Sequence, residues 1–131
     1  MVPHIQIDYS ANMEARLDMA GLCRALRDAA AATGVFPLAG IRARASACNH
    51  VVIADGDPAH GFIDIALRLR AGRSMEEKRR ATAAIFAAAE AFCAEDMARH
   101  SLALSLELRD IDPELSPKAS SIRRFLHGDD A

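Results

Sequence analysis

Three residues in this sequence are of types that could together move a proton on a small acidic molecule: Pro3, Arg42 and Arg73. A proline at the start of a chain carries a secondary amine. A free α-amine has a reference pKa of about 7.7–8.0, so it can accept and return a proton near neutral pH. Two nearby guanidinium groups would lower that pKa and bind two carboxylates through charge-assisted hydrogen bonds. The pattern is that of acid–base chemistry on a dicarboxylate, which needs neither a metal nor a cofactor.

Each of these residues also has a simpler structural interpretation. Pro3 is well suited to begin a strand. Arg42 could be a solvated strand residue, and Arg44 would share its face. Arg73 directly precedes Ser74, so it lies at a helix N-terminus, where a cation is unfavourable against the helix dipole. An anion bound between Arg73 and the N–H groups there would offset that cost, which makes Arg73 the more informative of the two candidate arginines.

The position of Pro3 bears on this chemistry, because in the sequence as written its nitrogen forms a peptide bond with Val2. The lone pair of an amide nitrogen is delocalised into the carbonyl and is not basic at neutral pH. We therefore expect the active form to begin at Pro3. Either Val2 is a misread start codon, or aminopeptidases remove Met1 and Val2.

Length and composition indicate one domain and exclude several classes of partner. The chain has 131 residues, of which 51% are hydrophobic, enough for one sizeable core. Charged residues make up 26% with a net charge of −2, so no overall field attracts nucleic acid or an anionic membrane. Aromatic residues are 5% and Trp is absent, which argues against a base-stacking surface.

The cysteines and histidines predict neither disulfides nor a metal site. Cys23, Cys48 and Cys93 are odd in number and widely spaced, as expected for free thiols in a reducing compartment. The histidines show no ligand spacing such as HxxxH. The N-terminus lacks a signal-peptide pattern, and the longest uncharged stretch is too short to span a membrane. We expect a cytoplasmic protein with no cofactor, no metal and no nucleic-acid or membrane partner.

The elements that must position Pro3, Arg42 and Arg73 alternate between strands and helices. A capping box at Ser74 and Glu77 predicts a long helix to roughly Arg99, and Asp18 can cap a helix that runs to about Thr33. Apolar residues at every second position predict strands. These strands cover His4–Tyr9, Ile41 to about Ala47, Phe62–Leu69 and Leu102–Leu108, with a further short strand at Val51–Ile53 that ends at an Asp-Gly turn.

The order of these elements is strand, helix, strand, and then the same again. It predicts an α/β (α+β) fold of two βαβ halves, a mixed four-stranded sheet with two helices on one face. We expect residues 1–131 to form one domain in which residues 113–131 are a tail with a short amphipathic helix. The strands carry Leu or Ile on one face and Ala or Ser on the other. We therefore expect a partner subunit to cover the second face.

Several stretches of the sequence resemble the 5-carboxymethyl-2-hydroxymuconate Δ-isomerase family of the tautomerase superfamily. The resemblance covers nearly the whole chain and rests on PHIQIDYSANM, AATGVFPLAGIRAR, IADG, LRAGRSMEEKR and LALSLEL. It implies a homotrimer of βαβ-βαβ subunits whose sheets close around a central barrel. It also implies proline as general acid/base, here Pro3, and two carboxylate-binding arginines, here Arg42 and Arg73. The implied substrate is a 2-hydroxymuconate-type unsaturated dicarboxylate from the breakdown of aromatic compounds.

Two alternatives remain open from the sequence. The first is a non-catalytic trimer of the same fold that binds an anion or a protein partner. The second is a tautomerase with a different substrate, because residues 45–52 lack the tryptophans found in relatives. Mass spectrometry of the natural N-terminus separates the first alternative from the isomerase, and a panel of substrates separates the second.

Overall fold

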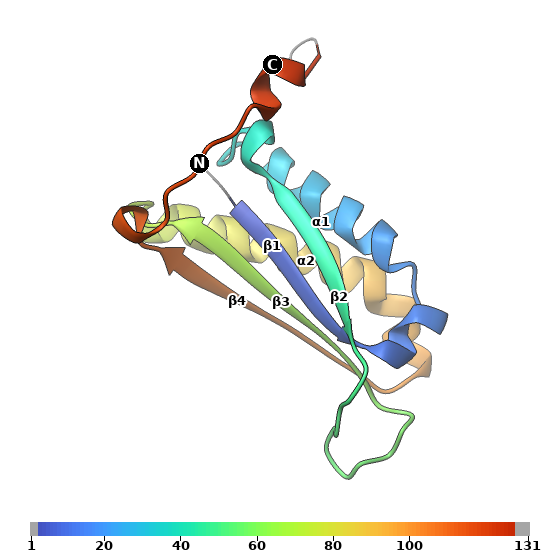
Figure 1. Cartoon of the computed structure of the whole chain (residues 1–131). Coiled ribbons are helices and arrows are strands. Elements are labelled where there is room, and N and C mark those ends of the chain that lie inside the picture. Colours follow the sequence, from blue (N-terminus) through green and yellow to red (C-terminus); the bar gives the residue numbers. More distant parts are fainter. Residues whose placement is uncertain (1–2, 128–131) are drawn as a thin grey trace.

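A computed structural model describes residues 3–127 of the chain (Figure 1). The strands are β1 (Pro3–Ser10), β2 (Arg42–Cys48), β3 (Gly61–Arg70) and β4 (Leu102–Ile111), and the α-helices are α1 (Met19–Ala32) and α2 (Met75–Arg99). Short 3-10 turns complete the chain: η1 (Ala11–Ala15), η2 (Leu38–Gly40), η3 (Pro113–Leu115) and η4 (Ile122–Phe125).

The four strands form one mixed sheet in the order β2-β1-β3-β4. The outer pairs, β1 with β2 and β3 with β4, are parallel, and the central pair β1 with β3 is antiparallel. Each parallel pair is connected through one helix, and both helices lie on the same side of the sheet (Figure 1). The predicted fold class, two βαβ halves that build a four-stranded mixed sheet under two helices, is confirmed.

The core lies between the sheet and the two helices. Because successive strand residues point to opposite faces, one side of each inner strand is fully buried. Ile5 and Ile7 of β1 have no exposed surface. The same holds for the inward-facing residues of β3 and for the inner stripes of the helices: Ile63, Ile65, Leu67, Leu69, Leu22, Leu26, Ala81 and Ile85.

The helix ends largely follow the predicted signals. The Glu77 N–H donates to Ser74 Oγ at 3.1 Å, and the Ser74 N–H donates to Glu77 Oε1 at 3.2 Å, so the capping box forms. Helix α1 begins directly after Asp18, although the Asp18 side chain makes no capping hydrogen bond. Gly34 follows the end of α1 with a φ of 71°, the left-handed conformation that glycine adopts without strain.

The prediction of a strand at Val51–Ile53 is wrong. These residues belong to a loop between β2 and β3 and pair with no strand among residues 3–127. Val52 is 89% exposed, so the short apolar run buries too little surface to hold an extended segment in place. The turn that follows does form, with the Gly56 N–H donating to the Ile53 carbonyl at 2.8 Å.

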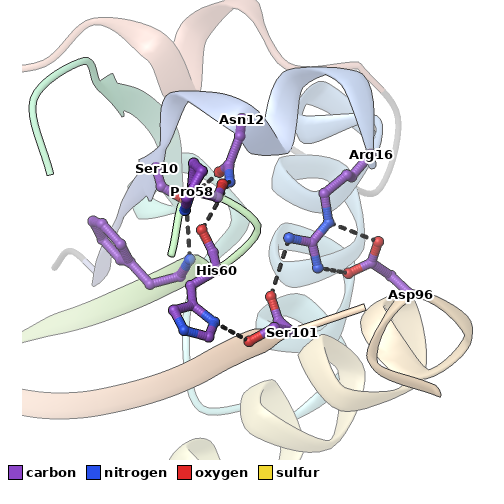
Figure 2. A network of polar contacts seen from close by, with 8 residues as sticks. Ser10, Asn12, Arg16, Pro58, His60, Asp96 and Ser101 are labelled. Atoms are coloured by element: carbon purple, nitrogen blue, oxygen red, sulfur yellow. Dashed lines mark hydrogen bonds and ion pairs between the residues drawn. The ribbon is translucent and has the colours of Figure 1, made fainter. Parts of the chain in front are cut away.

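A paired guanidinium and carboxylate close the end of the sheet where β1 finishes (Figure 2). Arg16 Nε and Nη2 donate to the two carboxylate oxygens of Asp96 at 3.1 and 2.6 Å, and Arg16 Nη1 donates to the Ser101 carbonyl at 3.1 Å. Asp96 lies near the end of α2, and Ser101 directly precedes β4. This bidentate contact therefore ties the turn after β1 to the second βαβ half.

The loop before β3 is anchored at the same end of the sheet. Asn12 Nδ2 donates to the His60 carbonyl at 2.8 Å, and Ser10 Oγ accepts a hydrogen bond from the Phe62 N–H at 2.9 Å (Figure 2). The His60 ring bridges Ser101 Oγ and Asp55 Oδ1, each at 2.7 Å. These contacts hold the loop at this end, opposite to the end where Pro3 begins β1.

The sheet face turned away from the helices is polar and charged. His4, Gln6 and Asp8 alternate with the buried residues of β1, and their Cα partners on β2 are Arg42, Arg44 and Ser46. The neighbouring strands continue this face with Asp64, Ala66, Arg68, Ser105, Glu107 and Arg109. We call it the open face. It carries more charge than the Ala and Ser that the sequence pattern suggested.

Candidate active site

The three candidate residues lie at one end of the sheet. Pro3 is the first residue of β1, Arg42 is the first residue of β2, and Arg73 lies in the turn between β3 and α2. Because β2 is parallel to β1 and β3 is antiparallel to it, the starts of β1 and β2 meet the end of β3. The topology therefore brings residues from three separate stretches of the sequence to the same end of the sheet.

Pro3 is a fully buried side chain at the start of the central strand. Its Cα partner is Leu69 of β3, and its ring lies on the same side of the sheet as Ile5. The position of Pro3 fits the simple interpretation that proline begins a strand. Its burial also fixes the proline ring in place. The expectation that the active form begins at Pro3 concerns Met1 and Val2, which lie outside the described residues, and it stays a prediction.

Arg73 is held by the segment that follows α1. Its Nη1 donates to the Val35 carbonyl at 3.1 Å, and its guanidinium lies 4.9 Å from the centroid of the Phe36 ring. Val35 and Phe36 are themselves buried in the core. No local sequence pattern indicated these two partners, although both lie in the GVFPLAG stretch that carries the family resemblance.

The N-terminus of α2 offers an anion fewer free amide donors than a helix without a capping box would. The capping box already uses the N–H groups of Ser74 and Glu77. An anion beside Arg73 would therefore depend mainly on the guanidinium and less on the end of the helix.

Arg42 lies on the other side of the sheet from the contacts of Arg73. Its Cα partner is His4, with which it shares the open face. Arg42 lines two neighbouring cavities, of about 200 and 380 Å³, and Lys118 from the C-terminal segment lines both. Neither of these two cavities is lined by Pro3 or Arg73. The three candidate residues thus share one end of the sheet, with the start of β1 between the two arginines.

The larger cavity is strongly cationic. Its lining includes His4 and four permanently charged side chains, Arg42, Arg68, Arg70 and Lys118. Burial lowers the pKa of His4 below its usual value, and the nearby charges of Arg68, Arg42, Arg44 and Lys118 lower it further. His4 is therefore neutral at pH 7, so the positive charge of the cavity comes from the arginines and the lysine.

The position of Arg68 could have been predicted from the alternating pattern of β3. This pattern places Arg68 on the opposite face from the buried leucines. No local pattern indicated Lys118, which reaches the cavity from the tail.

In residues 3–127, no group of three or more His, Cys, Asp or Glu side chains is placed to hold a metal ion. No helix in this part of the chain is long and apolar enough to cross a membrane.

The fold is tautomerase-like, and other solved structures share it. The solved structure of W0 fused 4-OT, a wild-type symmetric trimer, superposes with a TM-score of 0.63, covering 85% of this chain and 88% of that one. The two chains are only 22% identical, so this likeness shows the fold alone.

Closer similarities define the family. The family model of 5-carboxymethyl-2-hydroxymuconate isomerase matches residues 3–126. The 5-carboxymethyl-2-hydroxymuconate Delta-isomerase of Escherichia coli is 33% identical over 121 residues, which cover 92% of this chain and 96% of the relative. A crystal structure of a 5-carboxymethyl-2-hydroxymuconate delta-isomerase has a TM-score of 0.88 at 31% identity, covering 98% of this chain and 95% of that chain. The chain belongs to the 5-carboxymethyl-2-hydroxymuconate isomerase family, a family of isomerases in the tautomerase superfamily.

Proposed function

We propose that this protein is a cofactor-independent isomerase that moves a proton in a 2-hydroxymuconate-type unsaturated acid such as 5-carboxymethyl-2-hydroxymuconate. Such acids arise when aromatic compounds are broken down. The observation that supports the proposal is that Pro3, Arg42 and Arg73 lie at the same end of the sheet in a chain of this family. Pro3 is the proposed acid–base group, and the two arginines are the proposed carboxylate-binding groups.

The chemistry requires one group that takes a proton from oxygen and returns it to carbon. The Pro3 nitrogen, as a free secondary amine, removes the proton of the enol hydroxyl, and the C–O bond becomes a carbonyl. The electron pair moves along the conjugated chain, and a distant carbon receives the proton from the protonated amine. The intermediate is a dienolate, whose negative charge is stabilised by the guanidinium groups of Arg42 and Arg73. The proton that leaves the oxygen is the one that reaches the carbon, and no atom of the substrate is oxidised or reduced overall, so the step itself calls for no metal or cofactor.

The assembly that we propose is a homotrimer. Both helices described in residues 3–127 leave one face of the sheet open, which gives a partner subunit room to pack on that side, and a solved structure with the same fold is a symmetric trimer. In a trimer, a neighbouring subunit could complete the wall between Arg42 and Arg73. Light scattering at micromolar concentration should give the mass of three chains. A stable monomer would contradict this assembly.

We propose that the protein is located in the cytoplasm. Cys23, Cys48 and Cys93 are free thiols, as expected in a reducing compartment. Immunodetection after cell fractionation should find the protein in the cytoplasmic fraction. Its recovery from an oxidising compartment would contradict the proposal.

The decisive experiment varies the start of the chain. Protein expressed from Met-Pro-His loses its initiator methionine in the cell, which leaves Pro3 with a free amine, whereas the 131-residue form carries two further residues. Mass spectrometry verifies both N-termini before assay on 5-carboxymethyl-2-hydroxymuconate. We expect the form beginning at Pro3 to be active and the extended form to be nearly inactive, because an amide nitrogen is not a base. Equal activity of the two forms would exclude Pro3 as the proton carrier.

A further inference from the structure

The larger cationic cavity on the open face has a wall that comes from the C-terminal segment. After β4 this segment runs back across the ends of the strands toward the start of β2 (Figure 1). Residues 116–118 line the cavity of about 380 Å³ opposite His4 and the arginines. Pro113 and Pro117 restrict the backbone of the segment, so Lys118 is presented on a stiff stretch of chain.

The four cationic side chains around this cavity form no ion pair within residues 3–127. Arg42, Arg68, Arg70 and Lys118 take part in none of the ion pairs of this part of the chain, and no acidic side chain lines the cavity. The Nδ1 atom of His4 is also buried at this place without a hydrogen-bond partner among those residues. Like charges that converge on one cavity repel one another, and a bound anion would relieve that repulsion.

The proposed substrate supplies more negative charge than two arginines neutralise. The muconate skeleton carries two carboxylates, and the carboxymethyl substituent adds a third. Arg42 and Arg73 provide one guanidinium for each of two carboxylates. A further cationic group near Arg42 would attract the third carboxylate.

We propose, on the basis of the proposed function, that the cationic cavity binds the carboxymethyl carboxylate and that Arg68, Arg70 and Lys118 select the three-carboxylate acid over 2-hydroxymuconate. The cavity lies directly beside Arg42, which lines it. The selecting residues are binding groups that hold the remote end of the substrate, and Pro3 carries the proton.

The first test compares turnover of two substrates by protein that begins at Pro3. The variants are Arg70→Gln and Lys118→Gln, and the control is Arg80→Gln, which removes the same charge from an exposed position on α2. The two cavity variants should lower kcat/KM for 5-carboxymethyl-2-hydroxymuconate at least about tenfold more than for 2-hydroxymuconate, as the loss of a charge-assisted hydrogen bond predicts. The control should lower neither. Equal effects on both substrates, or no effect, would overturn the assignment of the cavity.

Absence of turnover of either substrate by the parent protein would contradict the proposed function, so a second test measures binding alone. Isothermal titration at low salt compares propane-1,2,3-tricarboxylate with glutarate. The parent protein should bind the tricarboxylate more tightly, and a variant with both Arg70→Gln and Lys118→Gln should lose that preference. Equal affinity of the parent for the two acids would overturn the inference whatever the kinetics show.

Light scattering on the same variants tests whether the cations instead bind acidic residues of a neighbouring subunit. If both cavity variants keep the mass of the parent assembly, the ligand assignment stands. If either variant dissociates the assembly, the cations serve a subunit contact and the inference is overturned.

Discussion

The guanidinium of Arg73 lies 4.9 Å from the centroid of the Phe36 ring, while its Nη1 donates a hydrogen bond to the Val35 carbonyl at 3.1 Å. A cation within about 6 Å of an aromatic ring centroid is attracted by the negative face of the ring. Together the two contacts fix a long side chain at the start of α2 before any substrate arrives. Such preorganisation reduces the entropy that binding of a carboxylate must overcome.

Replacing either candidate arginine should impair turnover more than it affects stability. Arg42→Ala and Arg73→Ala each remove charge-assisted hydrogen bonds of roughly 1.5–3 kcal/mol, so kcat/KM for the acid should fall about ten- to hundredfold. Arg44→Ala is the control, because Arg44 shares the open face with Arg42 but is hydrogen-bonded to Gln6 at 3.0 Å. Steady-state kinetics and thermal unfolding measure the two effects. Wild-type kcat/KM in both variants would show that the carboxylate assignment is wrong.

Phe36→Leu tests the support of Arg73 separately from its charge. Leucine keeps an apolar side chain in the buried position but removes the ring face under the guanidinium. The contact is worth about 0.5–1 kcal/mol at an exposed site, so we expect a rise in KM of roughly two- to fivefold. The kinetic comparison is made against Arg73→Ala. If Phe36→Leu lowered activity in a background that already carries Arg73→Ala, the ring would act through something other than Arg73.

The Arg16–Asp96 pair should contribute strongly to folding stability. The two side chains are only 13% and 4% exposed, so removing Arg16 leaves a buried carboxylate without its counter-ion. Such a loss costs about 3–5 kcal/mol, and we expect Arg16→Leu to lower the free energy of unfolding by that amount in urea titrations. Arg24→Leu is the matched control, since its contact with Asp18 at 3.5 Å joins two side chains that are 63% and 66% exposed. Similar losses in both variants would contradict a special role for the buried pair.

Tyr9 offers a clean spectroscopic probe, because it is the only tyrosine and the chain has no tryptophan. Its hydroxyl donates a hydrogen bond to the Glu14 carboxylate, and this bond together with burial raises the pKa of Tyr9 to about 12. The near-ultraviolet absorbance of phenolate should therefore appear well above pH 10, and Glu14→Gln should lower the midpoint. Since the folded state keeps a proton that the unfolded chain loses near pH 10, stability should fall as the pH rises toward 12. Phenolate formation at pH 10 in folded protein would contradict the buried hydrogen bond.

The pKa of His4 is a measure of the positive charge in the cationic cavity, because this residue lines the cavity. Burial and the charge of Arg68 lower the pKa of His4, so its imidazole should titrate below 6.5 in NMR spectra, and Arg68→Gln should move the midpoint upward. Because the unfolded chain binds a proton near pH 6.5 that the folded state resists, this residue makes the protein less stable as the pH falls below 6.5. Arg80→Gln serves as the control and should leave the midpoint in place. A midpoint above 6.5 would mean that His4 has a carboxylate neighbour instead.

The elements themselves follow from local sequence patterns. The alternation of Ile63, Ile65, Leu67 and Leu69 predicts a strand with one buried face, and it does so without any knowledge of the neighbouring strands. The capping box at Ser74 and Glu77 is likewise a contact between residues three apart, so its formation needs only the helix that it begins. Val51–Ile53 shows the limit of such patterns, because three apolar residues become a strand only where a partner strand lies beside them.

The contents of the candidate site were decided by tertiary structure. The sequence alone singled out Pro3, Arg42 and Arg73, but it could not show that Phe36 supports Arg73 or that Arg42 faces the opposite side of the sheet. These relationships depend on strand order and register, which bring distant segments together. Lys118 illustrates the point most clearly. It has no periodic pattern of its own, and it joins the cationic cavity only because the chain after β4 folds back over the ends of the strands.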